Sequence, residues 1–169
     1  MSIRSLDPFA VPLEGVNLVE AAAGTGKTWT ITALYLRLLL EQDLPVGKIL
    51  VVTYTRAATG ELRQRLRDAL VRALEAFESP GVCADPMIGP LLAADHDERT
   101  SVRKFRRALA DFDQAAVFTI HAFCERVLSD SAFQSGMTLN TELTPNDESL
   151  LAEVFDDLWR KEIYPASAC

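Results

Sequence analysis

Residues 20–28 read Glu20-Ala21-Ala22-Ala23-Gly24-Thr25-Gly26-Lys27-Thr28, directly after the apolar run 16–19. Gly24 and Gly26 permit a tight turn in which successive backbone N–H groups point at an anion. A helix that begins near Lys27 would add its positive N-terminal end to the same place. The stretch therefore predicts a phosphate-binding loop between a short buried strand, residues 16–21, and a helix.

Two side chains in this loop have defined chemistry. Lys27 is placed to reach the β- and γ-phosphates of a nucleotide, and the hydroxyl of Thr28 to ligate Mg²⁺. The usual pattern opens with glycine, and Ala21 occupies that place here. A glycine-rich turn without a ligand is the alternative, but the Gly-Lys-Thr ending between strand and helix favours a nucleotide site.

The composition indicates a soluble globular protein with no membrane partner. The chain has 169 residues, 49% of them hydrophobic, and a mean hydropathy of +0.08. The apolar run 31–40 is interrupted by Thr32 and Arg37 and is too short to span a membrane. The N-terminus has no apolar signal core, so we expect a cytoplasmic protein. The cysteines are widely spaced, which favours free thiols over a metal cluster; they are Cys83, Cys124 and Cys169.

The charge distribution is uneven. The net charge of −7 argues against a module that simply coats nucleic acid. Basic residues nevertheless cluster in residues 48–72 and 99–107, and acidic residues in 142–162. Charge runs of this kind are most often solvated helix faces.

Strands and helices alternate along the sequence. Apolar and β-branched runs predict strands over 16–21, 48–54 and 115–120; helical periodicity predicts helices over 28–41, 57–78, 100–111 and 121–133. Residues 82–90 are expected to be irregular. The order implies an α/β three-layer sandwich with a parallel sheet. A connector over 135–144 precedes a last helix, which Thr144 would cap with Pro145 in its first position.

Two further segments lie where predicted strands end. These are Thr53-Tyr54-Thr55-Arg56 and Thr119-Ile120-His121. The carboxyl edge of a parallel sheet is where α/β folds bind ligands. Hydroxyls and helix N-termini can hold phosphates of a nucleic-acid strand, and Tyr54 offers a face for base stacking. The alternatives are ordinary: Thr55 or Thr59 as a helix cap, Tyr54 as a core residue and His121 as a satisfied histidine.

Taken in order, the three segments resemble motifs I, Ia and Ib of superfamily 1 helicases of the UvrD/Rep class. Ala21 in place of the first glycine is common in that class. Within it the chain is most similar to the RecB family, the β subunits of the exodeoxyribonuclease V (RecBCD) helicase–nuclease. Four further stretches support this similarity: residues 6–8, 118–121, 133–137 and 147–151.

The resemblance implies a P-loop NTPase (RecA-like) motor domain, 1A, over residues 1–134 and the start of a helical 1B subdomain over 135–169. It implies ATP and Mg²⁺ as cofactors, with Thr28 as a metal ligand. The residues around ATP would be Ala21, Ala22, Ala23, Gly24, Thr25, Gly26, Lys27, Thr28 and Trp29. Trp29 stands where many relatives have an arginine near the adenine. DNA contacts would come from Thr53, Tyr54, Thr55, Arg56, Thr119 and His121.

The same resemblance implies single- and double-stranded DNA as partners, together with RecC- and RecD-like subunits, in double-strand break repair and recombination. Hydrolysis needs an acidic pair after a buried strand, and neither Asp97-Glu98 nor Asp147-Glu148 follows one. We therefore expect an N-terminal fragment of a RecB-like helicase that is not catalytic by itself. A small P-loop kinase or a non-catalytic helicase remnant remains the alternative.

The last helix gives the fragment interpretation a physical test. Six apolar residues form one face of this helix, which needs a partner: Leu150, Leu151, Val154, Phe155, Leu158 and Trp159. We expect this face to be partly exposed, poorly ordered or packed in a dimer contact, and a protease-resistant core to extend from about Leu13 to Phe133.

Overall fold

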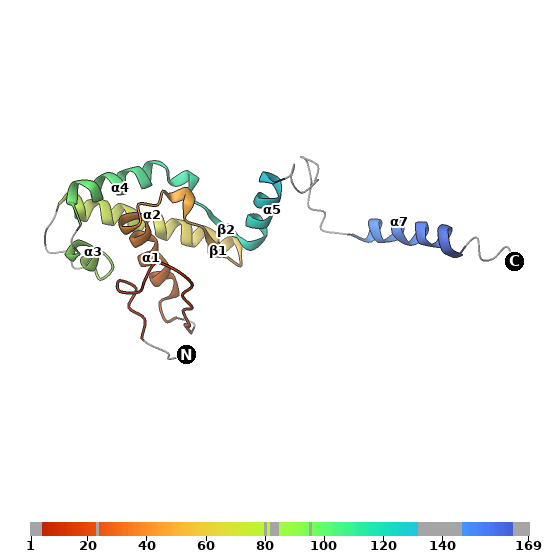
Figure 1. Ribbon diagram of the computed structural model, residues 1–169, viewed down its shortest axis with the longest axis horizontal. Helices are drawn as coiled ribbons and strands as arrows, with labels where there is room; N and C mark the ends of the chain where they lie inside the picture. The colour runs from red at the N-terminus through yellow and green to blue at the C-terminus, as the bar shows by residue number, and fades with distance from the viewer. Residues whose placement is uncertain are drawn as a thin grey trace. The chain divides into compact units, whose positions relative to one another are not determined.

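The computed structural model describes residues 5–22, 24–79, 81, 85–94, 96–131 and 147–163. The chain divides into two compact units, residues 1–125 and 126–169, and each is considered by itself. The described residues form a mixed α/β fold that is mostly helical, with a two-stranded parallel sheet in the first unit (Figure 1).

The first helix matches the prediction closely. Helix α1 spans Lys27–Glu41 and buries Ala33, Leu36 and Leu40. Its apolar residues lie almost all round the helix axis, which is typical of a helix packed on several sides. A short 3₁₀ turn, η1, covers Val46–Lys48 and leads into the sheet.

The two strands are parallel and shorter than predicted. Strand β1 covers Val51–Thr53 and strand β2 covers Val117–Thr119. Val51 is aligned with Val117, and Thr53 with Thr119. Thr55 caps the helix that follows β1 through a hydrogen bond from the N–H of Ala58. Four further elements connect the strands: α2 (Arg56–Glu78), α3 (Gly89–Ala93), α4 (Glu98–Ala110) and η2 (Phe112–Gln114).

The core lies between α1, α2 and α4. Its largest buried side chains include Phe105, Leu66 and Leu70, and the Phe77 and Phe105 rings lie 5.4 Å apart. Arg63 joins α2 to the segment before β2 through its guanidinium, which donates to the carbonyl oxygens of Phe112, Asp113 and Ala115. Helix α2 also packs against both strands.

The predicted strand over residues 16–21 is wrong for this structure. These residues form no strand, and Val16 is 100% exposed and Leu18 72% exposed. A buried parallel strand is stable only when a neighbouring strand pairs with its backbone. Among the described residues only β1 and β2 pair with each other, so this apolar run has no such neighbour.

The three-layer sandwich is likewise incomplete among the described residues. Helix α2 packs against both strands, whereas Leu50 and Val52 remain exposed. Residues 82–90 were predicted to be irregular, but Gly89 and Pro90 begin the short helix α3. Local pattern is a weak guide for such short elements because tertiary packing decides whether they form.

The N-terminal segment belongs to the core earlier than the expected start at Leu13. Pro8 is buried, and its carbonyl oxygen accepts a hydrogen bond of 2.7 Å from the guanidinium of Arg37. The same guanidinium donates to the carbonyl oxygen of Val11 at 2.8 Å and pairs with Glu41. Arg37 therefore attaches the N-terminal segment to α1.

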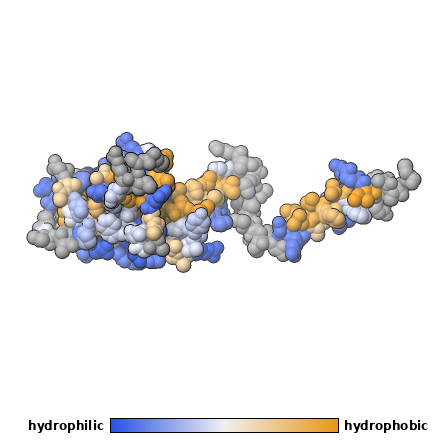
Figure 2. All heavy atoms as spheres, turned by 90° about the horizontal axis from the view of Figure 1, so that it is seen from below, coloured by the Kyte–Doolittle hydropathy of each residue, from blue (hydrophilic) through white to orange (hydrophobic). Residues whose placement is uncertain are grey.

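Helix α5, Ile120–Asp130, follows β2, and the second unit contains α7, Glu148–Leu158, and a single π-helical turn, Trp159–Ile163. Helix α7 begins later than predicted, with Asp147 at its N-cap position; Thr144 and Pro145 lie outside the described residues. The expected apolar face is exposed, from Leu150 at 62% to Trp159 at 48%. Figure 2 shows hydrophobic surface along this helix.

Tyr35 gives a pH-dependent prediction. Its side chain is 1% exposed, and its hydroxyl has no hydrogen-bond partner within the described part of the chain. Burial raises the pKa of this hydroxyl to about 12, against the lowering influence of Arg63. The unfolded chain therefore loses this proton near pH 10 while the folded chain keeps it, so stability should fall as the pH rises from about 10 to 12.

Urea unfolding at several pH values tests this prediction in wild type and Tyr35→Phe. Between about pH 10 and 12, the free energy of unfolding should decrease by about 2 to 3 kcal/mol less in Tyr35→Phe than in wild type, because two pKa units correspond to roughly that free energy. At neutral pH the variant should be at least as stable as wild type, since it removes an unpaired buried hydroxyl. Equal alkaline losses in the two proteins would contradict the assignment.

Candidate nucleotide site and nucleic-acid interface

Both glycines of the predicted phosphate-binding loop adopt a conformation that favours glycine. Gly24 and Gly26 have φ angles of 78° and 91°, in the left-handed region that favours glycine. A Cβ at either position would meet no other atom, so backbone conformation rather than space requires glycine there. Helix α1 begins at Lys27, immediately after Gly26. Ala23 lies outside the described residues.

Lys27 closes the loop on itself. Its ammonium nitrogen donates to the carbonyl oxygens of Ala21 at 2.9 Å and Ala22 at 2.8 Å. The hydroxyl of Thr25 donates to Ala22 as well, at 2.7 Å. An anion that binds here must draw the Lys27 ammonium away from two carbonyl oxygens. Even so, the exposed ammonium, the two left-handed glycines and the start of α1 fit a phosphate group.

Trp29 anchors the first turn of α1. Its ring packs edge-to-face against Phe9, with 5.9 Å between ring centroids. Beside it lies a pocket lined by Thr28, Trp29, Thr32, Arg65, Asp68, Arg72 and Met87. The α2 side chains of this lining could not be assigned to this turn from the sequence. Their spacing on one face of α2 was a signal, but only tertiary structure places that face beside α1.

The aligned strands bring the other two predicted segments to one edge. Because Thr53 pairs with Thr119, Tyr54 and Ile120 both stand directly beyond the carboxyl ends of their strands. Tyr54 is 88% exposed, so its interpretation as a core residue is wrong. Arg56 and His121 are exposed too.

The threonines of this edge have structural partners. Thr55 accepts from the N–H of Ala58, so its interpretation as a helix cap is correct. Thr59, the other candidate cap, instead donates its hydroxyl to the carbonyl oxygen of Thr55. Thr119 accepts from the N–H of Ala122. The hydroxyls of Thr53 and Thr59 lie 2.5 Å apart. These bonds orient the first turns of α2 and α5, whose N-terminal N–H groups favour anions.

Neither acidic pair is placed as a metal-binding pair. Asp97 caps α4 by accepting from the N–H of Thr100 at 2.8 Å, and hydrogen bonds from Thr100 lower the pKa of its carboxyl. Asp147 occupies the N-cap position of α7. Within the described residues no group of three or more His, Cys, Asp or Glu side chains could hold a metal ion. In the same part of the chain, no helix has the length and apolar character to cross a membrane.

Comparison with known proteins agrees with the motifs. Residues 6–167 match the UvrD/REP helicase N-terminal domain family. The chain is 41% identical to the RecBCD enzyme subunit RecB of Escherichia coli (strain K12) over 96% of its length. It is 37% identical to RecB of Haemophilus influenzae over 95% and 36% identical to that of Mycobacterium tuberculosis (strain H37Rv) over 87%. The chain spans 14% of the length of each of these relatives.

Proposed function

The chain belongs to the UvrD/REP helicase N-terminal domain family, and we propose that it supplies part of the ATP and DNA sites of a RecB-like helicase. Residues 1–134 would form part of a RecA-like three-layer motor domain, 1A. Residues 135–169 would begin the helical 1B subdomain. The observation that carries the proposal is the phosphate loop at the start of α1, together with two exposed loops at one sheet edge.

ATP would be held by its phosphates at this loop. The backbone of Gly24 to Gly26 and the start of α1 would hold the phosphate oxygens, and Lys27 would neutralise their charge. Thr28 would orient Mg²⁺, which stabilises the negative charge of the transferring phosphoryl group. Trp29 would lie near the base. Residues Ala21, Ala22, Ala23 and Thr25 would complete the loop.

DNA would lie along the carboxyl edge of the sheet. Tyr54 would stack on a base, and Arg56 and His121 would approach phosphates. Thr53, Thr55 and Thr119 would contribute mainly by orienting the first turns of α2 and α5, since their hydroxyls bind within the protein. Both single- and double-stranded DNA would be partners of the whole protein.

Catalysis would belong to the whole protein, an ATP-dependent DNA helicase and exonuclease acting in break repair and recombination. Water activation in such enzymes needs a carboxylate beside the γ-phosphate. Asp97 and Asp147 occupy N-cap positions instead, so this chain alone should bind nucleotide without hydrolysing it above background. RecC- and RecD-like subunits and a cytoplasmic location would follow from the same relationship.

Binding of single-stranded DNA tests the proposed edge. Tyr54→Ala and Arg56→Ala should each weaken binding of a fluorescent oligothymidine by about 5- to 30-fold, because a stacked base or a charged phosphate contact contributes about 1 to 2 kcal/mol. Binding should also weaken as salt rises, and the salt dependence should be smaller for Arg56→Ala.

Arg67→Ala is the matched control. Arg67 is an exposed arginine on the same helix, three turns from Arg56. Its replacement should change the affinity less than twofold. A loss as large as that of Arg56→Ala would show that the binding is non-specific charge attraction, and the proposed edge would have to be abandoned.

A further inference from the structure

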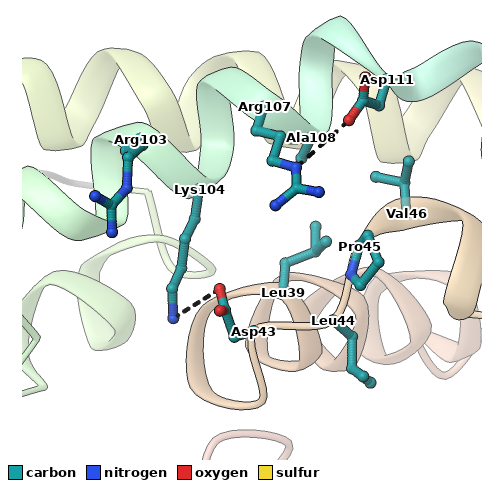
Figure 3. A pocket seen from close by; sticks show the side chains of 10 residues that line it. All are labelled: Leu39, Asp43, Leu44, Pro45, Val46, Arg103, Lys104, Arg107, Ala108 and Asp111. Atoms are coloured by element: carbon teal, nitrogen blue, oxygen red, sulfur yellow. Dashed lines mark ion pairs between the residues drawn. The ribbon is translucent and has the colours of Figure 1, made fainter.

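A basic pocket lies at the amino-terminal edge of the sheet, away from the proposed ATP and DNA contacts. It is formed between α4 and the end of α1 with the loop to η1 (Figure 3). Val46 precedes β1 and Asp111 precedes β2, so the pocket faces the opposite strand ends from Tyr54 and His121. Helix α1, about 22 Å long at roughly 1.5 Å per residue, separates it from the phosphate loop.

The lining combines an apolar floor with a basic rim. Leu39, Val46 and Ala108 form buried parts of the floor. All three basic side chains extend from α4: Lys104 reaches toward Asp43, Arg107 lies above Leu39, and Arg103 points to the far side of Lys104 (Figure 3). The pocket holds about 210 Å³, enough for one or two side chains but small for a nucleotide.

The three cations are not equivalent. Lys104 is largely engaged, with its ammonium 3.3 Å from the carboxylate of Asp43 and 2.8 Å from the carbonyl oxygen of Leu40. Arg107 makes only a loose pair with Asp111, at 3.6 Å, and is 74% exposed. Arg103 is exposed and has no ion-pair partner among the described residues. Arg103 and Arg107, one helical turn apart at the rim, are therefore the cations that a ligand can engage, Arg107 in exchange for its loose pair with Asp111.

We propose that this pocket docks a protein partner through a segment in which a carboxylate lies beside an aliphatic side chain. The aliphatic group would enter the floor, and the carboxylate would bind the forks of Arg103 and Arg107. A nucleic-acid strand fits less well, because its closely spaced phosphates would also meet the carboxylates of Asp43 and Asp111. The lining contains no aromatic ring on which a base could stack.

This surface is independent of the proposed motor site and would allow a partner to bind while ATP and DNA are bound. The probes are three synthetic peptides: one alternating glutamate and leucine, one with glutamine for glutamate, and one with alanine for leucine. Duplex DNA and inorganic phosphate complete the set. Binding is followed by the methyl NMR signals of Leu39, Val46 and Ala108.

The glutamate–leucine peptide should bind saturably and shift these methyl signals. The other two peptides should bind at least about tenfold more weakly, because each lacks one half of the interaction. Arg103→Ala/Arg107→Ala should reduce binding about tenfold or more. The control Arg67→Ala/Arg99→Ala, which replaces exposed arginines outside the pocket, should change it less than twofold.

All four substituted positions are exposed, so both double variants should keep the wild-type unfolding midpoint. No saturable binding of the glutamate–leucine peptide at millimolar concentration would overturn the proposal. Equal loss in the two double variants would also overturn it. Tighter binding of duplex DNA that depends on Arg103 and Arg107 would reassign the pocket to nucleic acid, and phosphate competing as well as the peptide would reduce it to a simple anion site.

Discussion

Lys27→Ala should weaken Mg-ATP binding by about 10- to 100-fold. The ammonium would make charge-assisted hydrogen bonds to the terminal phosphates, and loss of such bonds costs roughly 1.5 to 3 kcal/mol. The wild-type affinity should itself be modest. In the structure Lys27 donates to Ala21 and Ala22, and these bonds must be exchanged for phosphate contacts before the loop can hold a nucleotide. Titration with a fluorescent ATP analogue measures both effects.

Lys48→Ala is the matched control, since Lys48 is an exposed lysine in η1, outside the phosphate loop. It should leave nucleotide affinity within twofold of wild type. Lys27→Ala should keep the wild-type unfolding midpoint, because the Lys27 side chain is exposed. Equal nucleotide affinity in Lys27→Ala and wild type would refute the phosphate site. Steady ATP turnover that disappears in Lys27→Ala would instead support the small-kinase alternative.

The helices could be predicted well because their signals are local. Leu62, Leu66 and Leu70 recur every four residues in α2, and all three are buried. Thr55 and the glycines Gly24 and Gly26 likewise determine only the adjacent backbone. The ends of α1 and α2 could therefore be predicted from the sequence to within a residue or two. The position of the two loops at one sheet edge could be predicted for a different reason: parallel strands end at a shared edge.

The strands could not be predicted as well, because a strand depends on residues far away in sequence. The run 16–21 has the composition of a buried strand but no pairing partner among the described residues. The lining of the basic pocket could not be predicted for the same reason, because only tertiary packing brings Leu39 and Val46 to α4. Arg37 is a further example: its charge interrupts an apolar run, and only the tertiary structure shows that its side chain is buried and binds Pro8 and Val11.

Arg37→Ala should destabilise the first unit by about 2 to 4 kcal/mol. The Arg37 side chain is 7% exposed, and removing one partner of a buried ion pair costs about 3 to 5 kcal/mol. We expect a somewhat smaller value because Glu41 is 28% exposed and can be hydrated. The carbonyl oxygens of Pro8 and Val11 would also lose their donor. Urea unfolding measures the change.

Arg37→Ala should also change the surroundings of the proposed nucleotide site, because the N-terminal segment packs against it. When Arg37 no longer holds that segment, Phe9 should leave Trp29, which lies next to Thr28 in the first turn of α1. In a Trp159→Phe background, Trp29 emission should therefore shift to the red at urea concentrations that do not unfold the core. Arg67→Ala, at an exposed position, should change stability by less than about 0.5 kcal/mol. A loss below about 1 kcal/mol in Arg37→Ala, with unchanged Trp29 emission, would mean that the segment is held by apolar packing of Pro8 and Phe9 rather than by the guanidinium.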